Sequence, residues 1–474
     1  MAFSPFLWPS VSSSEVVQAS LKERFLALFV ISVCFLVAYN FTNWIIAARF
    51  LPWLAPGTAV FDWEKLLPFV PWMIVPYWTL DLFFVGSVFF CRSRVELLVL
   101  TRRIVLAILI AATCFLLFPL EMTFSKPEVF GIPGVLFRLL SNFDQPHNLV
   151  PSLHIALGVI LWTLYIPRSR GLLQPLLKGW FIIIGLSAIL TWQHHVIDVL
   201  TGYLLALFVI HLIPDNSDQR QPRVDRRRGI NSDPQIAVRY ALLFFLLILG
   251  TYFCWPYGAV LIWPAAAILI VGIAYAGVGP QLFRKGQTGY SNASRQLLAP
   301  FTICSYLSFR WFVRKQTPYV QLQDRMYFGQ MLDTEQVKEL LNRGVTAVVD
   351  LCAEYEEHRL FCTTSYLNVP VLDLTCPSEE QLCEACSFIQ EQLELGQTVY
   401  VHCALGISRS AAVVAAYLLY SGQVDSVEQV EKRLKSMRPR IRFWGELRAI
   451  LERFLVSVGK EHEGRTLLEE ARKV

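Results

Sequence analysis

The sequence predicts a polytopic all-α membrane domain of about eight spans, followed by an α/β domain. Of the 474 residues, 54% are hydrophobic and only 17% are charged, which is too apolar for an ordinary pair of soluble domains. This apolar excess lies almost wholly before residue 280. Near the other end, a β-type run at 398–401 leads through a short loop into a helical stretch at 411–420, an order typical of α/β domains.

The predicted spans are apolar segments separated by polar loops. They lie at about 25–46, 70–91, 104–120, 152–167, 177–193, 196–213, 240–256 and 259–279. Some are shorter than the roughly 20 residues usually needed to cross a bilayer.

Basic residues concentrate on alternate loops and orient the spans. Arg102 and Arg103, Arg168 and Arg170, and the run at 226–228 fall on one side, whereas the opposite loops carry few Lys or Arg. We therefore expect a multi-pass membrane protein with both termini in the cytoplasm. The net charge of +5 needs no nucleic-acid partner, because these topology signals account for much of it.

Five regions follow from these patterns. They are a membrane domain at 1–213, a basic cytoplasmic loop at 214–239, a transmembrane hairpin at 240–279, an amphipathic linker at 280–323 and an α/β domain at 324–474. The linker is expected either to lie on anionic lipid or to be an ordinary positively charged flank. Six of the eleven cysteines lie in the α/β domain, which suits a compartment that keeps thiols reduced.

The loop between the predicted strand and helix carries a nucleophile and an anion-binding group. Its sequence is His402-Cys403-Ala404-Leu405-Gly406-Ile407-Ser408-Arg409-Ser410. A thiolate attacks phosphorus, and backbone N–H groups at a helix start bind phosphate oxygens. Arg409 offers a planar fork for two oxygens, and Ser410 can hydrogen-bond the sulfur. The string predicts a metal-independent cysteine phosphatase with Cys403 as nucleophile and 404–408 as phosphate-binding loop; the alternative is a buried, inert cysteine.

A leaving alcohol needs a proton, so a general acid is expected upstream. Asp373 ends a β-type stretch and precedes a Pro-containing loop. The alternative is a helix cap or turn residue, although Ser378 is the better cap for the following helix.

Residues from about 327 to 454 resemble dual-specificity phosphatases. The stretches 327–329 and 345–351 are similar to the opening strands of that family. The resemblance implies Cys403 as nucleophile, Arg409 as phosphate binder and Asp373 as general acid.

A second constellation lies at the ends of two predicted spans. It comprises Asn148, Ser152 and His154 around the start of one span, and His194 and Asp198 around the start of another. Because the intervening spans run inward and then outward, both histidines fall on one membrane face, the outer one by the charge rule. Ionisable groups in membrane segments are costly and often functional, but a polar cluster that caps short helices is the alternative.

Residues 70–213 resemble the type 2 phosphatidic acid phosphatase superfamily. Pro151-Ser152-Leu153-His154 is similar to its second motif, and His194 with Asp198 to its third. The resemblance implies His194 as nucleophile and His154 as acid. The third motif lacks its usual Ser-Arg start, since Ala188 follows Ser187, which favours the branch resembling inositolphosphoryl- or cholinephosphoryl-transferring sphingolipid synthases.

The whole order resembles bacterial membrane proteins that combine these two families. This resemblance implies a plasma membrane location, in a bacterial inner membrane, with the phosphatase domain in the cytoplasm. It predicts an outward histidine site for lipid phosphates or phosphodiesters and a cytoplasmic cysteine phosphatase, with no cofactor. Expected partners are membrane lipid and a phosphorylated lipid or phosphoprotein. The alternatives are a signalling protein phosphatase with a lipid-sensing membrane half, and a non-catalytic scaffold.

Overall fold

The computed structural model describes residues 17–47, 58–141, 148–215, 232–287, 289–314 and 316–457. The chain divides into two compact units, Met1–Gln219 with Phe253–Ala259 and Arg220–Tyr252 with Val260–Val474. Most of the predicted basic loop, residues 216–231, lies outside the described residues.

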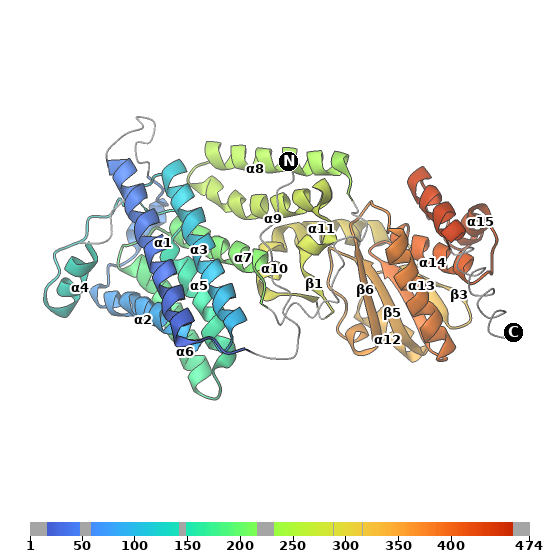
Figure 1. Ribbon diagram of the computed structural model, residues 1–474. Coiled ribbons are helices and arrows are strands. Elements are labelled where there is room, and N and C mark those ends of the chain that lie inside the picture. The colour runs from blue at the N-terminus through green and yellow to red at the C-terminus, as the bar shows by residue number, and fades with distance from the viewer. Residues whose placement is uncertain are drawn as a thin grey trace. The chain divides into compact units, whose positions relative to one another are not determined.

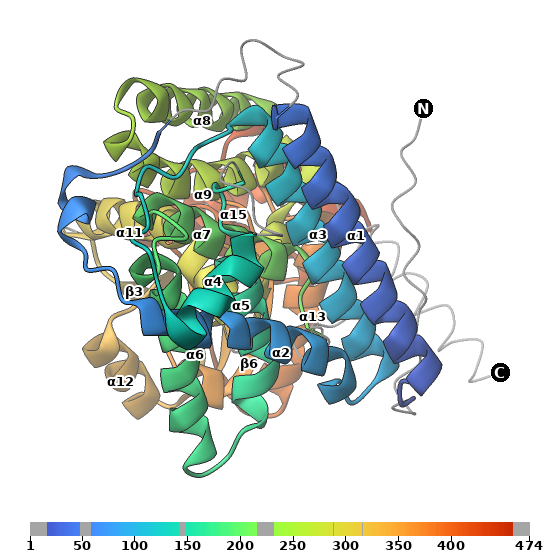
Figure 2. The same ribbon diagram turned by 90° about the vertical axis from the view of Figure 1, so that its left-hand side faces the viewer.

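The first unit is helical (Figure 1). Its main helices are α1 (Leu21–Ala47), α2 (Ile74–Phe90), α3 (Arg94–Leu117), α4 (Gly131–Ser141), α5 (Leu153–Tyr165), α6 (Leu173–Leu190) and α7 (Val196–Leu212). Figure 2 shows α1 and α3 running side by side. Serine side chains begin two of these helices: Ser93 accepts a hydrogen bond from the Glu96 amide, and Ser152 from the Ile155 amide, as N-caps do.

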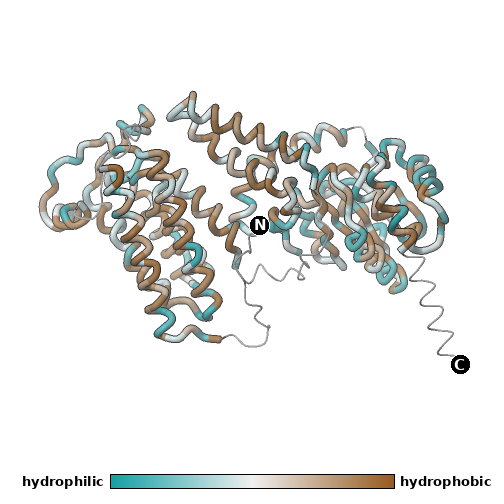
Figure 3. Tube along the Cα trace, turned by 45° about the horizontal axis from the view of Figure 1, so that its top comes forward, coloured by the Kyte–Doolittle hydropathy of each residue, from teal (hydrophilic) through white to brown (hydrophobic). Residues whose placement is uncertain are grey.

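Six helices in the described part of the chain are long and apolar enough to cross a membrane. They lie at Leu21–Ile46, Pro71–Phe90, Arg94–Leu117, Leu173–Leu190, Pro234–Phe253 and Tyr257–Val278. The predicted spans at 152–167 and 196–213 coincide with the shorter apolar helices α5 and α7. Figure 3 shows the helices of the first unit hydrophobic along most of their length. A count of eight spans therefore stays a prediction.

The second unit contains a five-stranded sheet of order β3-β4-β7-β5-β6. The strands are β3 (Tyr319–Gln323), β4 (Met326–Gln330), β5 (Val345–Cys352), β6 (Ser365–Val371) and β7 (Thr398–Cys403). β4, β7, β5 and β6 are parallel, and β3 pairs antiparallel at the edge. The predicted opening strands and the strand before the Cys403 loop are thus present.

Helices cover both faces of this sheet. They are α12 (Thr334–Asn342), α13 (Glu379–Glu394), α14 (Arg409–Tyr420) and α15 (Val427–Met437). Val337 and Leu340 of α12 pack with Val348 and Tyr400 on one face. The larger core, which includes Phe328, lies on the other face under α13 to α15, as Figure 1 shows. Ser378 begins α13 with the predicted cap, in a reciprocal pair with Gln381.

Between the last apolar helices and the sheet lie several short elements. The helices α8 (Pro234–Phe253) and α9 (Ile262–Ile273) are followed by a helical turn at Ala274–Val278. Then come β1 (Lys285–Gly286), β2 (Gly289–Tyr290), α10 (Asn292–Leu297) and α11 (Ala299–Val313). Tyr240 of α8 and Tyr275 place their rings 5.5 Å apart, which ties this hairpin together.

The closest approach between α5 and α7 supplies a test of the first unit. A Cβ at Gly202 would lie 2.3 Å from the Ser152 carbonyl oxygen, whereas a Cβ at Gly179 of α6 would meet no heavy atom within 4 Å. We expect Gly202→Ala to lower the free energy of unfolding by about 1–3 kcal/mol through overpacking, and Gly179→Ala to lower it little or not at all. Thermal unfolding of the purified protein in detergent measures both; equal stability would contradict this packing.

Candidate active site

The Cys403 loop joins the end of β7 to the start of α14, as predicted. Gly406 has φ of +67°, and a Cβ there would lie 2.5 Å from the Gly329 carbonyl carbon. A glycine is therefore required for two reasons, the left-handed backbone and the close approach of β4. Cys403 is buried, and its Sγ lies 3.4 Å from the Ser410 hydroxyl.

The surroundings of Cys403 favour its thiolate. Burial alone would raise the pKa of this thiol. The Arg409 charge, the Ser410 hydroxyl and the backbone N–H groups of Ser410 and Gly406 outweigh burial and lower the pKa below its usual value. The loop therefore supplies the activated nucleophile that the chemistry needs.

Other buried cysteines show the contrast. Burial and the neighbouring Asp350 carboxylate hold the pKa of Cys352 well above the usual thiol value. Burial likewise holds the pKa of Cys386 well above the usual thiol value. Burial therefore does not activate Cys403. The charge of Arg409 and the hydrogen bonds of the loop lower its pKa.

Arg409 is a buried cation held by carboxylates. Its two terminal nitrogens donate to the two Glu354 carboxylate oxygens at 2.9 and 2.7 Å. The same nitrogens also donate to the Val371 carbonyl at 2.9 Å and to Asp373 Oδ1 at 2.8 Å. This bidentate pair with Glu354 fixes the plane of the guanidinium group.

Asp373, the predicted general acid, lies beside Arg409. Its side chain is about half exposed, at 51%, and its carbonyl oxygen accepts a hydrogen bond of 2.9 Å from the Tyr275 hydroxyl. The next residue, Leu374, has φ of +61°, an uncommon conformation for a residue with a side chain. The Asp373 turn is therefore held from both sides.

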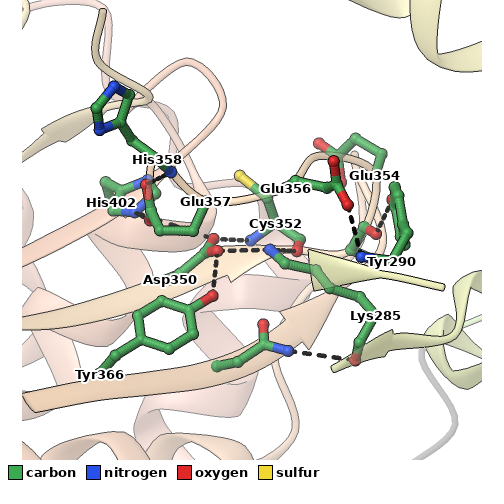
Figure 4. Close-up of polar contacts among 12 residues, drawn as sticks. Lys285, Tyr290, Asp350, Cys352, Glu354, Glu356, Glu357, His358, Tyr366 and His402 are labelled. Carbon is green, nitrogen blue, oxygen red and sulfur yellow. Dashed lines mark hydrogen bonds and ion pairs between the residues drawn. The ribbon is translucent and has the colours of Figure 1, made fainter. Parts of the chain in front are cut away.

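Behind the Cys403 loop lies a buried network of charges (Figure 4). His402 Nε2 contacts the Glu357 carboxylate, and the Asp350 carboxylate lies 4.0 Å away. Burial disfavours the charged ring, but the Glu357 and Asp350 carboxylates raise the pKa of His402 to about 9. Asp350 also accepts a hydrogen bond of 2.8 Å from the Tyr366 hydroxyl, and Lys285 donates to it.

The residues Asp350, Cys352 and His402 bring ligand-type atoms within 4.8 Å of one another. Such a group can bind a metal ion. Here the Lys285 ammonium donates to Asp350 Oδ2 and to the Cys352 carbonyl oxygen. That ammonium supplies the positive charge for which Asp350 would otherwise need a metal.

Sequence reasoning missed Glu354, Glu357 and Lys285. The stretch 354–357, with three glutamates, resembles an exposed charged turn. Glu354 and Glu357 are nevertheless 5% and 4% exposed in their side chains. A dense acidic run directly after a buried strand was the one available signal.

In the first unit, the structure brings the predicted histidine and aspartate together. His194 Nδ1 lies 3.3 Å from Asp198 Oδ2, and the same oxygen accepts the His195 amide at 2.8 Å. His154 stacks on Tyr77 with ring centroids 4.0 Å apart. Its Nε2 is buried, with no hydrogen-bond partner among the described residues.

The two other predicted site residues, Ser152 and Asn148, make hydrogen bonds within the protein. Ser152 caps α5, and its amide donates to the Asp198 carbonyl at 3.0 Å, so the two motifs touch. Asn148 donates to the Thr42 hydroxyl at 3.3 Å. Roles for Ser152 and Asn148 in substrate binding stay predictions.

Comparisons with known proteins find phosphatases similar to part of the second unit. Residues 326–453 match the family model "Dual specificity phosphatase, catalytic domain". Phosphatidylglycerophosphate phosphatase PTPMT1 of Arabidopsis thaliana is 32% identical over 134 residues, 27% of this chain and 38% of that protein. Dual specificity protein phosphatase 2 of Mus musculus is 32% identical over 134 residues, 27% of this chain and 41% of that protein. Both matches cover well under two thirds of the relative.

A crystal structure of PTPMT1 aligns with 26% identity and a TM-score of 0.28, covering 31% of this chain and 99% of that one. The match of residues 326–453 to the family model identifies them as a dual-specificity phosphatase catalytic domain. The resemblance of residues 70–213 to type 2 phosphatidic acid phosphatases stays a prediction.

The Ser410 hydroxyl supplies a test of thiol activation. We expect Ser410→Ala to raise the pKa of Cys403, because one of the groups that lower it is lost. Alkylation of Cys403 by iodoacetamide, followed by mass spectrometry of its peptide across a pH series, should shift to higher pH. Ser408→Ala, in the same loop, is the control; an unshifted profile in Ser410→Ala would contradict the assignment.

Proposed function

We propose that the second unit is a metal-independent phosphatase that hydrolyses phosphomonoesters through a phosphocysteine. The observation that carries this proposal is the thiol of Cys403, whose pKa is lowered by Arg409 and the loop N–H groups. Attack by the thiolate forms an S–P bond and breaks the P–O bond of the ester. Water then attacks the phosphocysteine, which releases phosphate and restores the thiolate.

The contacts of Arg409 link the release of Asp373 to the binding of the substrate phosphate. Both terminal nitrogens of Arg409 already donate to Glu354, and one also donates to Asp373. A phosphate that binds the guanidinium edge takes the place of the Asp373 carboxylate. Asp373 is then free, in its protonated form, to give its proton to the leaving oxygen, and afterwards to accept one from the attacking water.

We propose a lipid phosphomonoester as the substrate of this domain. A relative at 32% identity is named a phosphatidylglycerophosphate phosphatase. In this chain, the Asp373 turn is bonded to Tyr275, which follows the apolar helix α9, and Leu374 is 59% exposed. An acyl chain could contact this exposed Leu374 side chain beside Asp373.

A phosphoprotein substrate is the alternative, since another relative is named a dual specificity protein phosphatase. Ala404, Leu405 and Ile407 add no cation to the loop. A singly phosphorylated group suits this loop better than a polyanionic head group.

The proposed location is the plasma membrane, in a bacterial inner membrane, with the phosphatase domain in the cytoplasm. Six long apolar helices and the concentration of Arg and Lys on alternate loops support this topology. Its even number of spans places Cys403 on the side of the basic loops.

A second proposed activity belongs to the histidine constellation of the first unit, where the structure joins His194 to Asp198. With Nδ1–H donated to that carboxylate, the lone pair of His194 Nε2 can attack the phosphorus of a lipid phosphate or phosphodiester. His154 would protonate the leaving oxygen. Transfer of the phosphoryl group to water or to another alcohol would complete the reaction.

Substitution of Cys403 tests the first activity. The full-length protein in detergent with a metal chelator should hydrolyse an aryl phosphate, and Cys403→Ser should abolish turnover because no thiolate remains. Cys352→Ser, which changes a buried cysteine outside the loop, is the control for loss of a thiol. Asp373→Asn should slow poor leaving groups much more than good ones. Activity that survives Cys403→Ser would refute the proposal.

Substitution of His194 tests the second activity and the topology together. In sealed right-side-out vesicles, His194→Ala should eliminate turnover of lipid phosphate in the outer leaflet, because the proposed nucleophile is lost. Aryl phosphate hydrolysis by Cys403 should appear only after permeabilisation and should not change. His211→Ala, a buried histidine of α7, is the matched control. Lipid turnover that persists in His194→Ala would exclude the histidine mechanism.

A further inference from the structure

The loop that presents Glu354 to Arg409 is held by residues upstream of the phosphatase family match. That loop, residues 352–356, begins at the last residue of β5 and lies within the matched range of 326–453. The residues that hold it lie at 285–305, in the segment predicted as a linker. Figure 4 shows Lys285 and Tyr290 reaching this loop from β1 and β2.

The upstream segment contacts residues on both sides of Glu354 in this loop. Lys285 Nζ donates to the Cys352 carbonyl at 2.7 Å, and the Tyr290 hydroxyl donates to the Ala353 carbonyl at 2.7 Å. The Ser305 hydroxyl bonds to that of Tyr355. Each of these three loop residues is thus bonded to the upstream segment.

Glu356 receives the largest share of these contacts. It accepts the Tyr290 amide at 2.6 Å. It also accepts Arg295 through two guanidinium nitrogens, at 2.8 and 3.1 Å. Its carboxylate therefore clamps β2 and α10 to the loop.

Glu354 is the one loop residue whose side chain turns the other way, to Arg409. The residues on either side of Glu354, Ala353 and Tyr355, are both hydrogen-bonded to the upstream segment. The position of the Arg409 fork, which must match phosphate geometry closely, therefore depends on how firmly residues 352–356 are held.

Lys285 itself is placed as a buried structural charge. It is 1% exposed in its side chain, as is its partner Asp350. Asp350 stands beside His402 in the pairing of β5 with β7. Without this ammonium, Asp350 would lose its closest cation and keep only the Tyr366 hydroxyl, the Cys352 amide and the His402 ring at 4.0 Å. Loss of a close cation from a buried carboxylate is unfavourable, and this carboxylate lies one residue from the nucleophile in the neighbouring strand.

We propose that Lys285 and Tyr290 are positioning residues of the phosphatase, and that its catalytic unit begins at β1 and not near residue 324. The upstream segment acts through the 352–356 loop on Glu354 and Arg409. For its kinetic part, this inference rests on the proposed phosphatase function.

Hydrogen–deuterium exchange tests the inference without requiring activity. In the full-length protein, Tyr290→Phe should speed amide exchange at 352–357 about fivefold or more, because the bond to Ala353 is lost. Exchange in β4 should not change, which reports an intact fold. Tyr306→Phe, an exposed tyrosine on α11, is the matched control. Equal exchange at 352–357 in Tyr290→Phe and Tyr306→Phe would overturn the inference.

Lys285→Met removes a buried charge and is expected to weaken folding, so the double variant Lys285→Met with Asp350→Asn accompanies it. The double variant should fold, since neither partner is left charged, and should still show faster exchange at 352–357. Arg310→Met, which removes an exposed cation of the same segment, should leave exchange there unchanged. Unchanged exchange in the folded double variant would count against Lys285.

Inhibition by orthovanadate supplies the kinetic readout. Tyr290→Phe should raise the inhibition constant and KM about fivefold, because the fork of Arg409 is less well oriented. A purely structural role would lower the active fraction and leave both constants unchanged, which would refute positioning. If the wild-type protein neither binds vanadate nor hydrolyses phosphate esters, the proposed function fails, and the exchange result still decides the inference.

Discussion

The bidentate pair between Arg409 and Glu354 is the interaction on which the catalytic loop depends. Arg409 is 2% exposed, and a buried guanidinium needs a carboxylate with good geometry. Glu354 supplies this partner through two hydrogen bonds. The same guanidinium lowers the pKa of Cys403. Glu354 therefore supports both the orientation of the phosphate-binding group and the activation of the nucleophile.

The charges behind the loop balance one another. Lys285 and His402 are the cations of this network, and Asp350 and Glu357 the carboxylates. Since the pKa of His402 is raised to about 9, its ring is charged at neutral pH. His402 therefore anchors the end of β7 through Glu357, in keeping with an ordering role, and leaves thiolate stabilisation to Arg409 and the loop amides.

In the first unit, the Asp198 carboxylate makes the contacts expected both of a helix cap and of a catalytic histidine site. Asp198 Oδ2 accepts the His195 amide, as a helix cap does, and also lies 3.3 Å from His194 Nδ1. Capping fixes the carboxylate, and the fixed carboxylate orients the imidazole. A cap at this helix start is thus compatible with a nucleophilic histidine and does not argue against it.

The sequence alone determined those features whose residues are close together in the chain. The loop from Cys403 to Ser410 is a local string between a strand and a helix, and the apolar spans are continuous runs, so pattern and spacing were sufficient to predict them. Asp373 could be found because its strand end and its Pro-containing loop are also local. Alternating span directions predict that His154 and His194 lie on one membrane face, and this stays a prediction.

Only the tertiary structure decided which charges are buried and paired. Lys285 and Asp350 are 65 residues apart, and Arg409 and Glu354 are 55 apart. Local sequence periodicity cannot predict such pairs, because each partner by itself resembles a solvated surface residue. The fold makes them structural, since the strand order brings β5 beside β7 and the upstream segment closes over the buried carboxylates, where an unpaired charge would be strongly unfavourable.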